Sequence, residues 1–280
     1  MTESSFADLH QLRYGTDADR DSAALAVNER LGGIIGRRTI RQFEDRPIPD
    51  GLMTQLLAAA QSGPTKSDLQ QYSIILVDDV ANREAISEWI GTMPFIVSAS
   101  AFLVFCGDIR RSRRLCEADG RPHANDNLDS FFNATVDGSV AMQSFVLGAE
   151  GAGLCCVPVS YIRNHGPKIA ELLAIPEGVF PIAGVAVGYP VWEGKPSIRL
   201  PQDVVVHRDT YDDSAMPDLV ADYDARRHEI DPNGPGRQRN ENVYGVSDVC
   251  PWSEQISRQL SLPERPDFRQ FIEAQGFSLS

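Results

Sequence analysis

Three arginines form the most prominent cluster of chemically useful residues in this sequence. Arg37, Arg38 and Arg41 stand close together, although the chain of 280 residues has a formal net charge of −13. If the segment is helical, Arg41 shares a face with Arg37 or Arg38. Converging guanidinium groups bind phosphate or carboxylate strongly. A solvated basic face would have the same composition, so the residues alone leave a binding role and a plain surface role open.

Two further segments carry polar groups next to predicted strands. The loop over residues 64–71 offers hydroxyl, ammonium and carboxylate groups on four successive residues, Thr65, Lys66, Ser67 and Asp68. Such loops commonly bear recognition groups, but a plain turn between a helix and a strand would look the same. The segment 195–201 adds Lys195 and Arg199, which either bring more positive charge to a site or lie on a solvated turn.

Several other kinds of site are disfavoured by their motifs. The glycine-rich segment 148–153 follows a predicted helix and precedes a strand, whereas a Rossmann phosphate loop follows a strand and opens a helix. We therefore expect it to end the helix. The histidines and cysteines have no metal-ligand spacing, and no nucleophile elbow or P-loop motif occurs. The sequence thus predicts no metal site.

Composition narrows the class of protein. The acidic balance disfavours general binding to nucleic acid, because phosphate contacts need a basic surface. No apolar run is long enough for a transmembrane helix, and the first residues lack the pattern of a signal peptide. An odd number of cysteines, 5, is typical of a reducing compartment. We expect a cytoplasmic protein that binds neither nucleic acid nor membrane.

Hydrophobic periodicity predicts a mixture of helices and strands from residue 31 onward. Helices are expected over residues 52–61, 81–90, 131–149 and 165–175, and strands over residues 72–77, 100–108, 154–162 and 180–190. The helix over 131–149 is mostly apolar, which predicts a central, buried position. The polar first thirty residues are expected to hold at most a short helix over 22–30, and residues 110–127 to form an irregular loop.

The order of these segments resembles that of the FMN-dependent nitroreductases, and especially the larger NADPH-preferring, oxygen-insensitive members and related flavin reductases. The resemblance extends from about residue 31 to the C-terminus. It rests on the motifs RRTIRQF (37–43), GPTKSDLQQYSIILV (63–77), SAFLVFCGD (100–108), GAGLCCVPVSYIRN (151–164), FPIAGVAVGYP (180–190) and KPSIRLP (195–201).

The resemblance implies the architecture. It predicts an α+β fold with a mostly antiparallel central sheet flanked by helices, in an intertwined homodimer with two FMN sites at the interface. Residues 1–30 would form a polar extension before a nitroreductase domain over residues 31–280. Within that domain, a tail over residues 204–280 would embrace the partner subunit and would include a mobile loop over residues 231–248.

The resemblance also implies which residues bind FMN. The phosphate and ribityl chain would be held by two basic segments, through Arg37, Arg38, Thr39, Arg41, Lys195 and Arg199. The isoalloxazine ring would be met by a loop, typically of the other subunit, and by a strand end, through Thr65, Lys66, Ser67, Asp68, Pro158, Val159, Ser160 and Tyr161. Met93 stands where a polar residue often contacts the flavin.

The implied reaction is a ping-pong hydride transfer. NADPH would reduce the flavin at N5, and a nitroaromatic or quinone-type acceptor would then take the electrons. The cofactor carries the redox chemistry, so no catalytic side chain is required. Cationic groups near the flavin would stabilise its reduced, anionic form. Arg237 and Arg239, in the predicted mobile loop, would bind the 2′-phosphate of NADPH.

One departure from the family pattern leaves the acceptor open. Tyr161 stands where small residues are common, and a tyrosine there can narrow the pocket or stack on an aromatic acceptor. The alternative functions are a flavin reductase, a reductase of a dedicated metabolic substrate, or a flavin-binding protein without catalytic activity.

Overall fold

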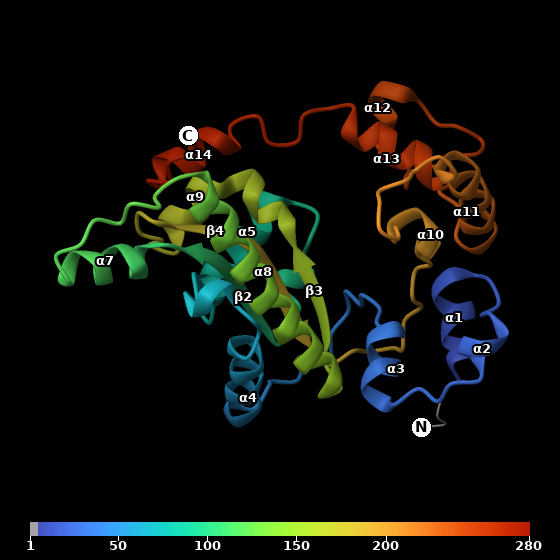
Figure 1. Ribbon diagram of the computed structural model, residues 1–280, viewed down its shortest axis with the longest axis horizontal. Coiled ribbons are helices and arrows are strands. Elements are labelled where there is room, and N and C mark those ends of the chain that lie inside the picture. The colour runs from blue at the N-terminus through green and yellow to red at the C-terminus, as the bar shows by residue number, and fades with distance from the viewer. Residues whose placement is uncertain (1–4) are drawn as a thin grey trace. The chain divides into compact units, whose positions relative to one another are not determined.

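The computed structural model describes residues 5–280, and the chain divides into two compact units (Figure 1). Unit 1 contains the described residues up to Arg37 together with Lys195–Glu264, and unit 2 contains Arg38–Gly194 together with Arg265–Ser280. Among the described residues, no helix combines the length and the apolar character needed to cross a membrane.

Unit 2 is built on one antiparallel sheet of four strands in the order β1-β2-β4-β3. The strands are β1 (Tyr72–Leu76), β2 (Ala101–Asp108), β3 (Cys155–Val159) and β4 (Val179–Gly188). Each strand lies where the apolar runs predict one. The α+β fold with an antiparallel sheet is therefore confirmed, and β1 and β3 are its two edges.

Helices cover both faces of this sheet. The helices of unit 2 are α4 (Asp50–Gln61), α5 (Val80–Ile90), α6 (Phe95–Ser98), α7 (Arg110–Ala118), α8 (Leu128–Gly151), α9 (Gly166–Leu172) and α14 (Phe268–Ala274), with the 3₁₀ turns η1 (Lys66–Asp68) and η2 (Ser160–His165). Phe102 and Val104 of β2 face one apolar cluster, and Leu103 and Phe105 face the other. This alternation is expected of a strand whose two faces are both buried.

The central position predicted for the apolar helix over residues 131–149 is confirmed by α8, which packs on α4 and β2. Asn127 caps its N-terminus by accepting hydrogen bonds from Asp129 N and Ser130 N. Gly138 allows the close approach, since a Cβ there would lie 2.4 Å from Ile182 Cδ1 and 3.1 Å from Cys106 O. Only a residue without a side chain lets α8 lie this near to the sheet.

The prediction of an irregular loop over residues 110–127 is wrong for its first half, which forms α7. This helix buries no side chain, so it has no apolar periodicity to reveal it. Polar contacts hold it instead: Arg111 N donates to Asp108 Oδ1 at 3.2 Å, and Arg113 Nε donates to Asp126 Oδ2 at 3.0 Å.

Unit 1 is entirely helical in its regular structure. Its helices are α1 (Phe6–Tyr14), α2 (Arg20–Ala23), α3 (Glu29–Ile35), α10 (Gln202–Val205), α11 (Met216–Ile230), α12 (Glu241–Tyr244) and α13 (Trp252–Leu260). The prediction of at most a short helix over residues 22–30 is wrong, and the part of the predicted 1–30 extension over residues 1–4 lies outside the described residues. Helix α1 forms because Ser5 and Asp8 make a reciprocal capping box and because Leu9 is buried.

A buried carboxylate of α8 anchors the loop before β1. Asp137 is 1% exposed, and its two oxygens accept the backbone N–H groups of Lys66 and Gln71, each at 3.0 Å. Lys66 Nζ also donates to the exposed Asp129 at 2.9 Å. Asp137 thus holds both ends of the segment 66–71 against the core of unit 2.

Replacing Asp137 with Asn keeps the side-chain volume but places an N–H₂ group opposite a backbone N–H. We expect the free energy of unfolding in urea to fall by about 1–3 kcal/mol, the cost of an unsatisfied buried donor. Amide hydrogen exchange at Lys66 and Gln71 should become faster. Asp129→Asn is the matched control, because Asp129 is exposed and meets Lys66 only through its side chain. Unchanged stability and exchange in Asp137→Asn would contradict this anchoring role.

Candidate functional site

The basic segment after α3 is not helical. Helix α3 ends at Ile35 with Gly36 as its C-cap, and residues 37–42 form neither helix nor strand before Phe43 pairs with Pro190. The conditional expectation that Arg41 shares a helical face with Arg37 or Arg38 is therefore wrong. Ile40 is only 3% exposed, so burial of this side chain, and not helical periodicity, determines the course of the segment.

In unit 1, Arg13 forms hydrogen bonds with the main chain of two predicted phosphate ligands, Arg37 and Arg199. Its Nη2 donates to Arg37 O at 2.7 Å, and its own carbonyl accepts from Arg199 N at 2.8 Å. Burial lowers the pKa of Arg13, and the positive charges of Arg199 and Arg37 lower it further. Among the described residues, the Arg199 guanidinium meets only carbonyl oxygens, those of Ser197 at 3.3 Å and Ile198 at 3.5 Å. Positive charge is thus concentrated here.

In unit 2, Arg38 lies near the beginning of β3. Its Nε donates to Glu193 O, and its charge acts on the thiol of Cys155. Burial raises the pKa of Cys155 to about 12, Glu150 raises it as well, and Arg38 opposes both effects. A thiol with this pKa is no nucleophile at neutral pH. Arg38 therefore places positive charge at an end of the sheet where the nearby thiol, that of Cys155, is unreactive.

Three other predicted phosphate or ribityl ligands have their side chains available. Arg41 in unit 2 and Lys195 in unit 1 are exposed, and neither has a hydrogen bond or ion pair to any described residue. Thr39 is half-buried, and its hydroxyl is likewise without a partner in the described range. These groups can each take up an anion or a hydroxyl of a ligand without breaking a contact.

The loop containing Thr65, Lys66, Ser67 and Asp68 has an unusual backbone. Ser67, Asp68 and Gln70 have φ values of 50°, 58° and 49°, in the left-handed region that residues with a Cβ rarely adopt. Strain of this kind persists only where surrounding contacts impose it, and it is concentrated at functional sites. Here the two hydrogen bonds to Asp137 impose it. The exposed side chains of this loop are thereby held in fixed positions.

The predicted ring-packing segment lies at the opposite edge of the sheet. Pro158, Ser160 and Tyr161 are exposed at the end of β3, whereas Val159 is buried. Pro158 is tolerated because β3 is an edge strand. Three strand spacings separate β3 from β1, a distance of roughly 14 Å. A single chain therefore does not bring the loop before β1 and the end of β3 together.

Met93 lies at the margin of the core. It is half-buried and packs against the apolar cluster that also includes Ile86 and Phe95. Its carbonyl accepts from Ser87 Oγ at 3.3 Å and from Ile96 N at 3.1 Å. The structure thus gives Met93 a packing role, and its predicted place beside the flavin stays a prediction.

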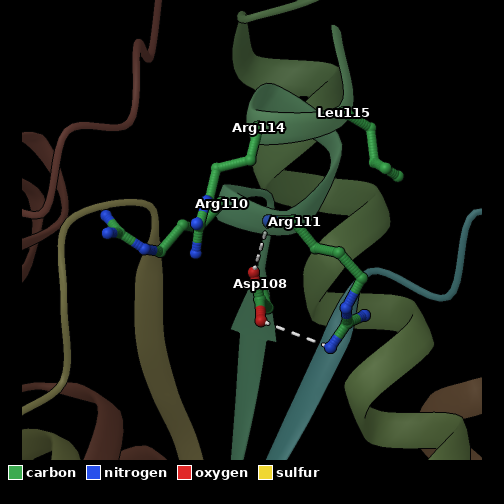
Figure 2. A pocket seen from close by; sticks show the side chains of 5 residues that line it. All are labelled: Asp108, Arg110, Arg111, Arg114 and Leu115. Atoms are coloured by element: carbon green, nitrogen blue, oxygen red, sulfur yellow. Dashed lines mark hydrogen bonds and ion pairs between the residues drawn. The ribbon is translucent and has the colours of Figure 1, made fainter. Parts of the chain in front are cut away.

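Two surface hollows in unit 2 are lined by none of the predicted ligands. One, of about 460 Å³, is lined by Asp108, Arg110, Arg111, Arg114 and Leu115. Figure 2 shows Arg111 turned toward Asp108, and 3.6 Å separate Arg111 Nη2 from Asp108 Oδ2. Arg110 and Arg114 extend to the other side of α7. The other, of about 600 Å³, lies between α9 and α14. Neither hollow contains a predicted site residue.

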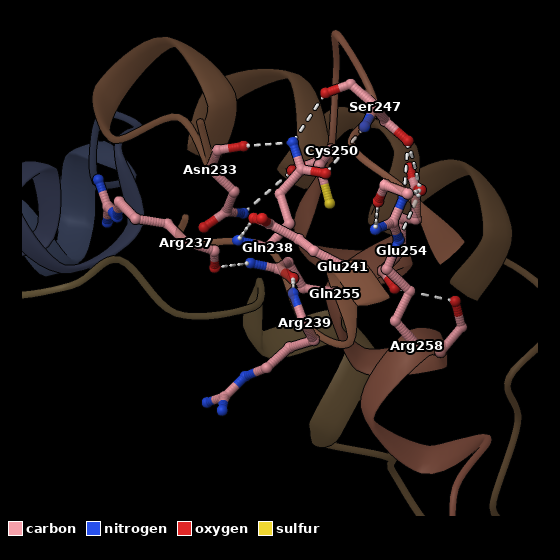
Figure 3. A network of polar contacts seen from close by, with 12 residues as sticks. Asn233, Arg237, Gln238, Arg239, Glu241, Ser247, Cys250, Glu254, Gln255 and Arg258 are labelled. Carbon is pink, nitrogen blue, oxygen red and sulfur yellow. Dashed lines mark hydrogen bonds and ion pairs between the residues drawn. The ribbon is translucent and has the colours of Figure 1, made fainter. Parts of the chain in front are cut away.

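The segment over residues 231–248, in unit 1, is crossed by side-chain hydrogen bonds and includes α12 (Figure 3). Gln238 donates to the carbonyls of Asn233 and Ser247 at 3.1 and 2.7 Å, and Arg237 pairs with Asp231 at 2.9 Å. The hydrogen bond from Arg237 lowers the pKa of Asp231. The Arg239 side chain extends away from this network. The predicted mobility of this loop stays a prediction.

Two residues that sequence reasoning missed are Asp137 and Arg13. Asp137 is a charged residue in the middle of a mostly apolar helix, and that interruption is a signal that could have singled it out. Arg13 has no such signal, because it stands in a polar segment and its farthest partner, Ser197, is 184 positions away.

Comparisons with known proteins agree with this architecture. The model of the nitroreductase family matches residues 34–189, and that of the nitroreductase family C-terminal domain matches residues 195–280. An FMN reductase [NAD(P)H] of Bacillus subtilis is 30% identical over 90% of this chain and 99% of its own length. An oxygen-insensitive NADPH nitroreductase of Salmonella typhimurium is 31% identical over 88% of this chain and 96% of its own length.

Solved structures show the same similarity. The structure of B. megaterium NfrA2 superposes with a TM-score of 0.82 at 31% identity, over 91% of this chain and all of that one. The NADPH:FMN oxidoreductase of Vibrio harveyi, solved in complex with NAD⁺, superposes with a TM-score of 0.77 at 26% identity, over 89% of this chain and 98% of that one. With the two family models matched over residues 34–189 and 195–280, this chain belongs to the nitroreductase family.

Proposed function

We propose that this protein is an FMN-dependent oxidoreductase that uses NADPH to reduce small electron-poor acceptors such as nitroaromatics and quinones. The observation that carries the proposal is a set of arginines whose guanidinium groups meet only carbonyl oxygens or no described residue, in a chain of net charge −13. Arg13, Arg199 and Arg41 are its members. The names of the relatives, which are FMN reductases and nitroreductases, support the same activity.

The chemistry of the proposed donors suits the phosphate and ribityl chain of FMN. Arg37, Lys195 and Arg199 in unit 1, and Arg38, Thr39 and Arg41 in unit 2, supply cationic and hydroxyl groups. Planar guanidinium groups bind phosphate with two parallel hydrogen bonds, which gives both affinity and orientation. When bound, FMN supplies the hydride chemistry that the side chains of this chain do not.

The ring-contacting residues have separate tasks. Pro158, Ser160 and Tyr161 present an exposed surface at the end of β3 on which a planar ring can pack. The strained loop presents Lys66, whose ammonium group is already oriented by Asp129. A positive charge held in place offsets negative charge that develops on a bound ring system without reorganisation of the protein. Tyr161, 42% exposed, is free to stack on an aromatic acceptor.

We propose a homodimer in which each site is completed by the partner subunit. The loop before β1 and the end of β3 lie at opposite edges of the sheet, so one flavin meets both only if they come from different chains. An unpartnered apolar stripe supports this assembly, since Leu128, Phe132 and Val136 recur every fourth residue on α8 and are 53%, 62% and 42% exposed. Along the proposed embracing tail, residues 204–280, Tyr211 is 76% exposed.

The dimer is tested by mass in solution. Light scattering on the purified protein should give twice the chain mass of 30.8 kDa. Phe132→Glu places a charge in the proposed interface and should shift the mass toward that of one chain, whereas the same change at Leu115, exposed on α7, should not. A single-chain mass for the unaltered protein would contradict the dimer.

Arg41 tests the FMN assignment directly. Arg41→Ala should weaken FMN binding by about 10- to 100-fold, because a charge-assisted hydrogen bond to phosphate is lost. Flavin content after dialysis and titration with FMN measure this change. Arg269→Ala is the control, since Arg269 is also exposed but pairs with Glu273 on α14. Full flavin occupancy in Arg41→Ala would remove the assigned role.

Arg239 tests the choice of electron donor. Its side chain extends away from the network of Figure 3, so Arg239→Ala should leave the fold unchanged. We expect KM for NADPH to rise about tenfold and KM for NADH to stay constant, because only NADPH carries the 2′-phosphate. Arg237→Ala provides the comparison, since Arg237 also pairs with Asp231. An equal rise for both donors would exclude recognition of the 2′-phosphate by Arg239.

A further inference from the structure

The N-terminal helix α1 reaches the proposed phosphate ligands, although it precedes the region that the family models match. That region begins at residue 34, and α1 spans Phe6–Tyr14. Its residue Arg13 is 7% exposed, which is rare for an arginine. A loosely attached extension would leave such a side chain exposed, so the burial of Arg13 indicates that α1 is packed against the rest of unit 1.

Arg13 connects two segments that are far apart in the sequence. Its Nε donates to Ile35 O at 2.8 Å, its Nη2 to Arg37 O at 2.7 Å, and its Nη1 to Ser197 O at 2.9 Å. In return, Arg199 N donates to the carbonyl of Arg13 at 2.8 Å. One residue thus holds the main chain of both Arg37 and Arg199.

The position of α1 is itself fixed by packing within unit 1. A Cβ on Gly32 or Gly36 of the α3 region would lie 3.7 Å from Leu9, so α1 packs closely on this part of the chain. Gly15 ends α1 with φ 68°, and a Cβ there would lie 3.3 Å from Ile230. The buried Tyr223 donates its hydroxyl to Ile198 O at 3.2 Å and so holds the second segment.

The charge of Arg13 is not balanced by an acid. All hydrogen bonds from its guanidinium group to described residues go to carbonyl oxygens, and no carboxylate of a described residue pairs with it. A buried guanidinium normally has an acidic partner, because burial of an uncompensated charge is costly. The neighbouring charges here are Arg199 and Arg37, which have the same sign. A bound dianionic phosphate would place negative charge beside Arg13 and Arg199, whose guanidinium groups meet only carbonyl oxygens among the described residues.

We propose that Arg13 is a positioning residue for the phosphate of the flavin cofactor, and that helix α1 is therefore part of the cofactor site. Arg13 keeps the segments that carry Arg37 and Arg199 side by side against the repulsion of their charges. This inference rests on the proposed function, since it takes FMN phosphate as the anion.

The test compares two flavins that differ only in the phosphate. FMN and riboflavin are titrated by quenching of flavin fluorescence into the unaltered protein and into Arg13→Gln and Arg13→Lys. Arg13→Gln should raise Kd for FMN by about 10- to 100-fold and leave Kd for riboflavin unchanged. Arg13→Lys keeps the charge but loses the planar fork, so it should recover less than half of the loss.

Arg20→Gln is the matched control. Arg20 is an exposed arginine of α2, on the same N-terminal segment and with the same change of charge, and its Kd for FMN should stay unchanged. A second measurement needs no variant: amide exchange at Arg199, whose N–H is bound to Arg13, should slow when FMN is added and not when riboflavin is added.

The outcomes separate this inference from the proposed function. If the unaltered protein binds no FMN, both are overturned. If it binds FMN and Arg13→Gln binds FMN equally well, or loses FMN and riboflavin to the same extent, only the role of Arg13 is overturned. Full recovery in Arg13→Lys would also overturn it, because charge alone would then explain the effect. If Arg13→Gln fails to fold, the amide-exchange measurement on the unaltered protein decides. An equal exchange rate at Arg199 with FMN and with riboflavin would then overturn the role of Arg13.

Discussion

The sheet of unit 2 is buried on both faces, and this constraint determines where a ligand can be met. Helices cover the two apolar faces, so the polar groups of the sheet itself are accessible at the strand ends and along the edges β1 and β3. The strained loop before β1 and the exposed end of β3 are these places. Because these two places lie at opposite edges of the sheet, we propose that each site combines the end of β3 of one chain with the loop before β1 of a second chain.

Electrostatics determine what such a site can hold. The chain is acidic overall, yet among the described residues the guanidinium groups of Arg13 and Arg199 meet only carbonyl oxygens, and Arg41 is exposed without a partner. Keeping like charges together costs free energy unless an anion joins them. Asp137 has the complementary task in unit 2, because its carboxylate orders the backbone of a loop rather than neutralising a cation.

Sequence reasoning predicted the elements that bury apolar side chains, since their periodicity follows from packing. The strands over 72–77 and 100–108 and the helix over 131–149 are examples. It failed for α1 and α7, which are held by capping and ion pairs. It also failed for the segment 37–42, because burial of Ile40 determines the backbone there and the arginines do not form a helix. Arg13 and Asp137 could not be predicted as anchors, because their partners become neighbours only in the folded chain.

The visible spectrum of the purified protein, recorded before and after anaerobic addition of NADPH, tests the central claim most directly. We predict a yellow protein whose flavin absorption bleaches on reduction, because the arginines retain FMN and NADPH reduces it. A colourless protein that also takes up no added FMN would contradict the account, and the arrangement of arginines around Arg13 would then need a different ligand.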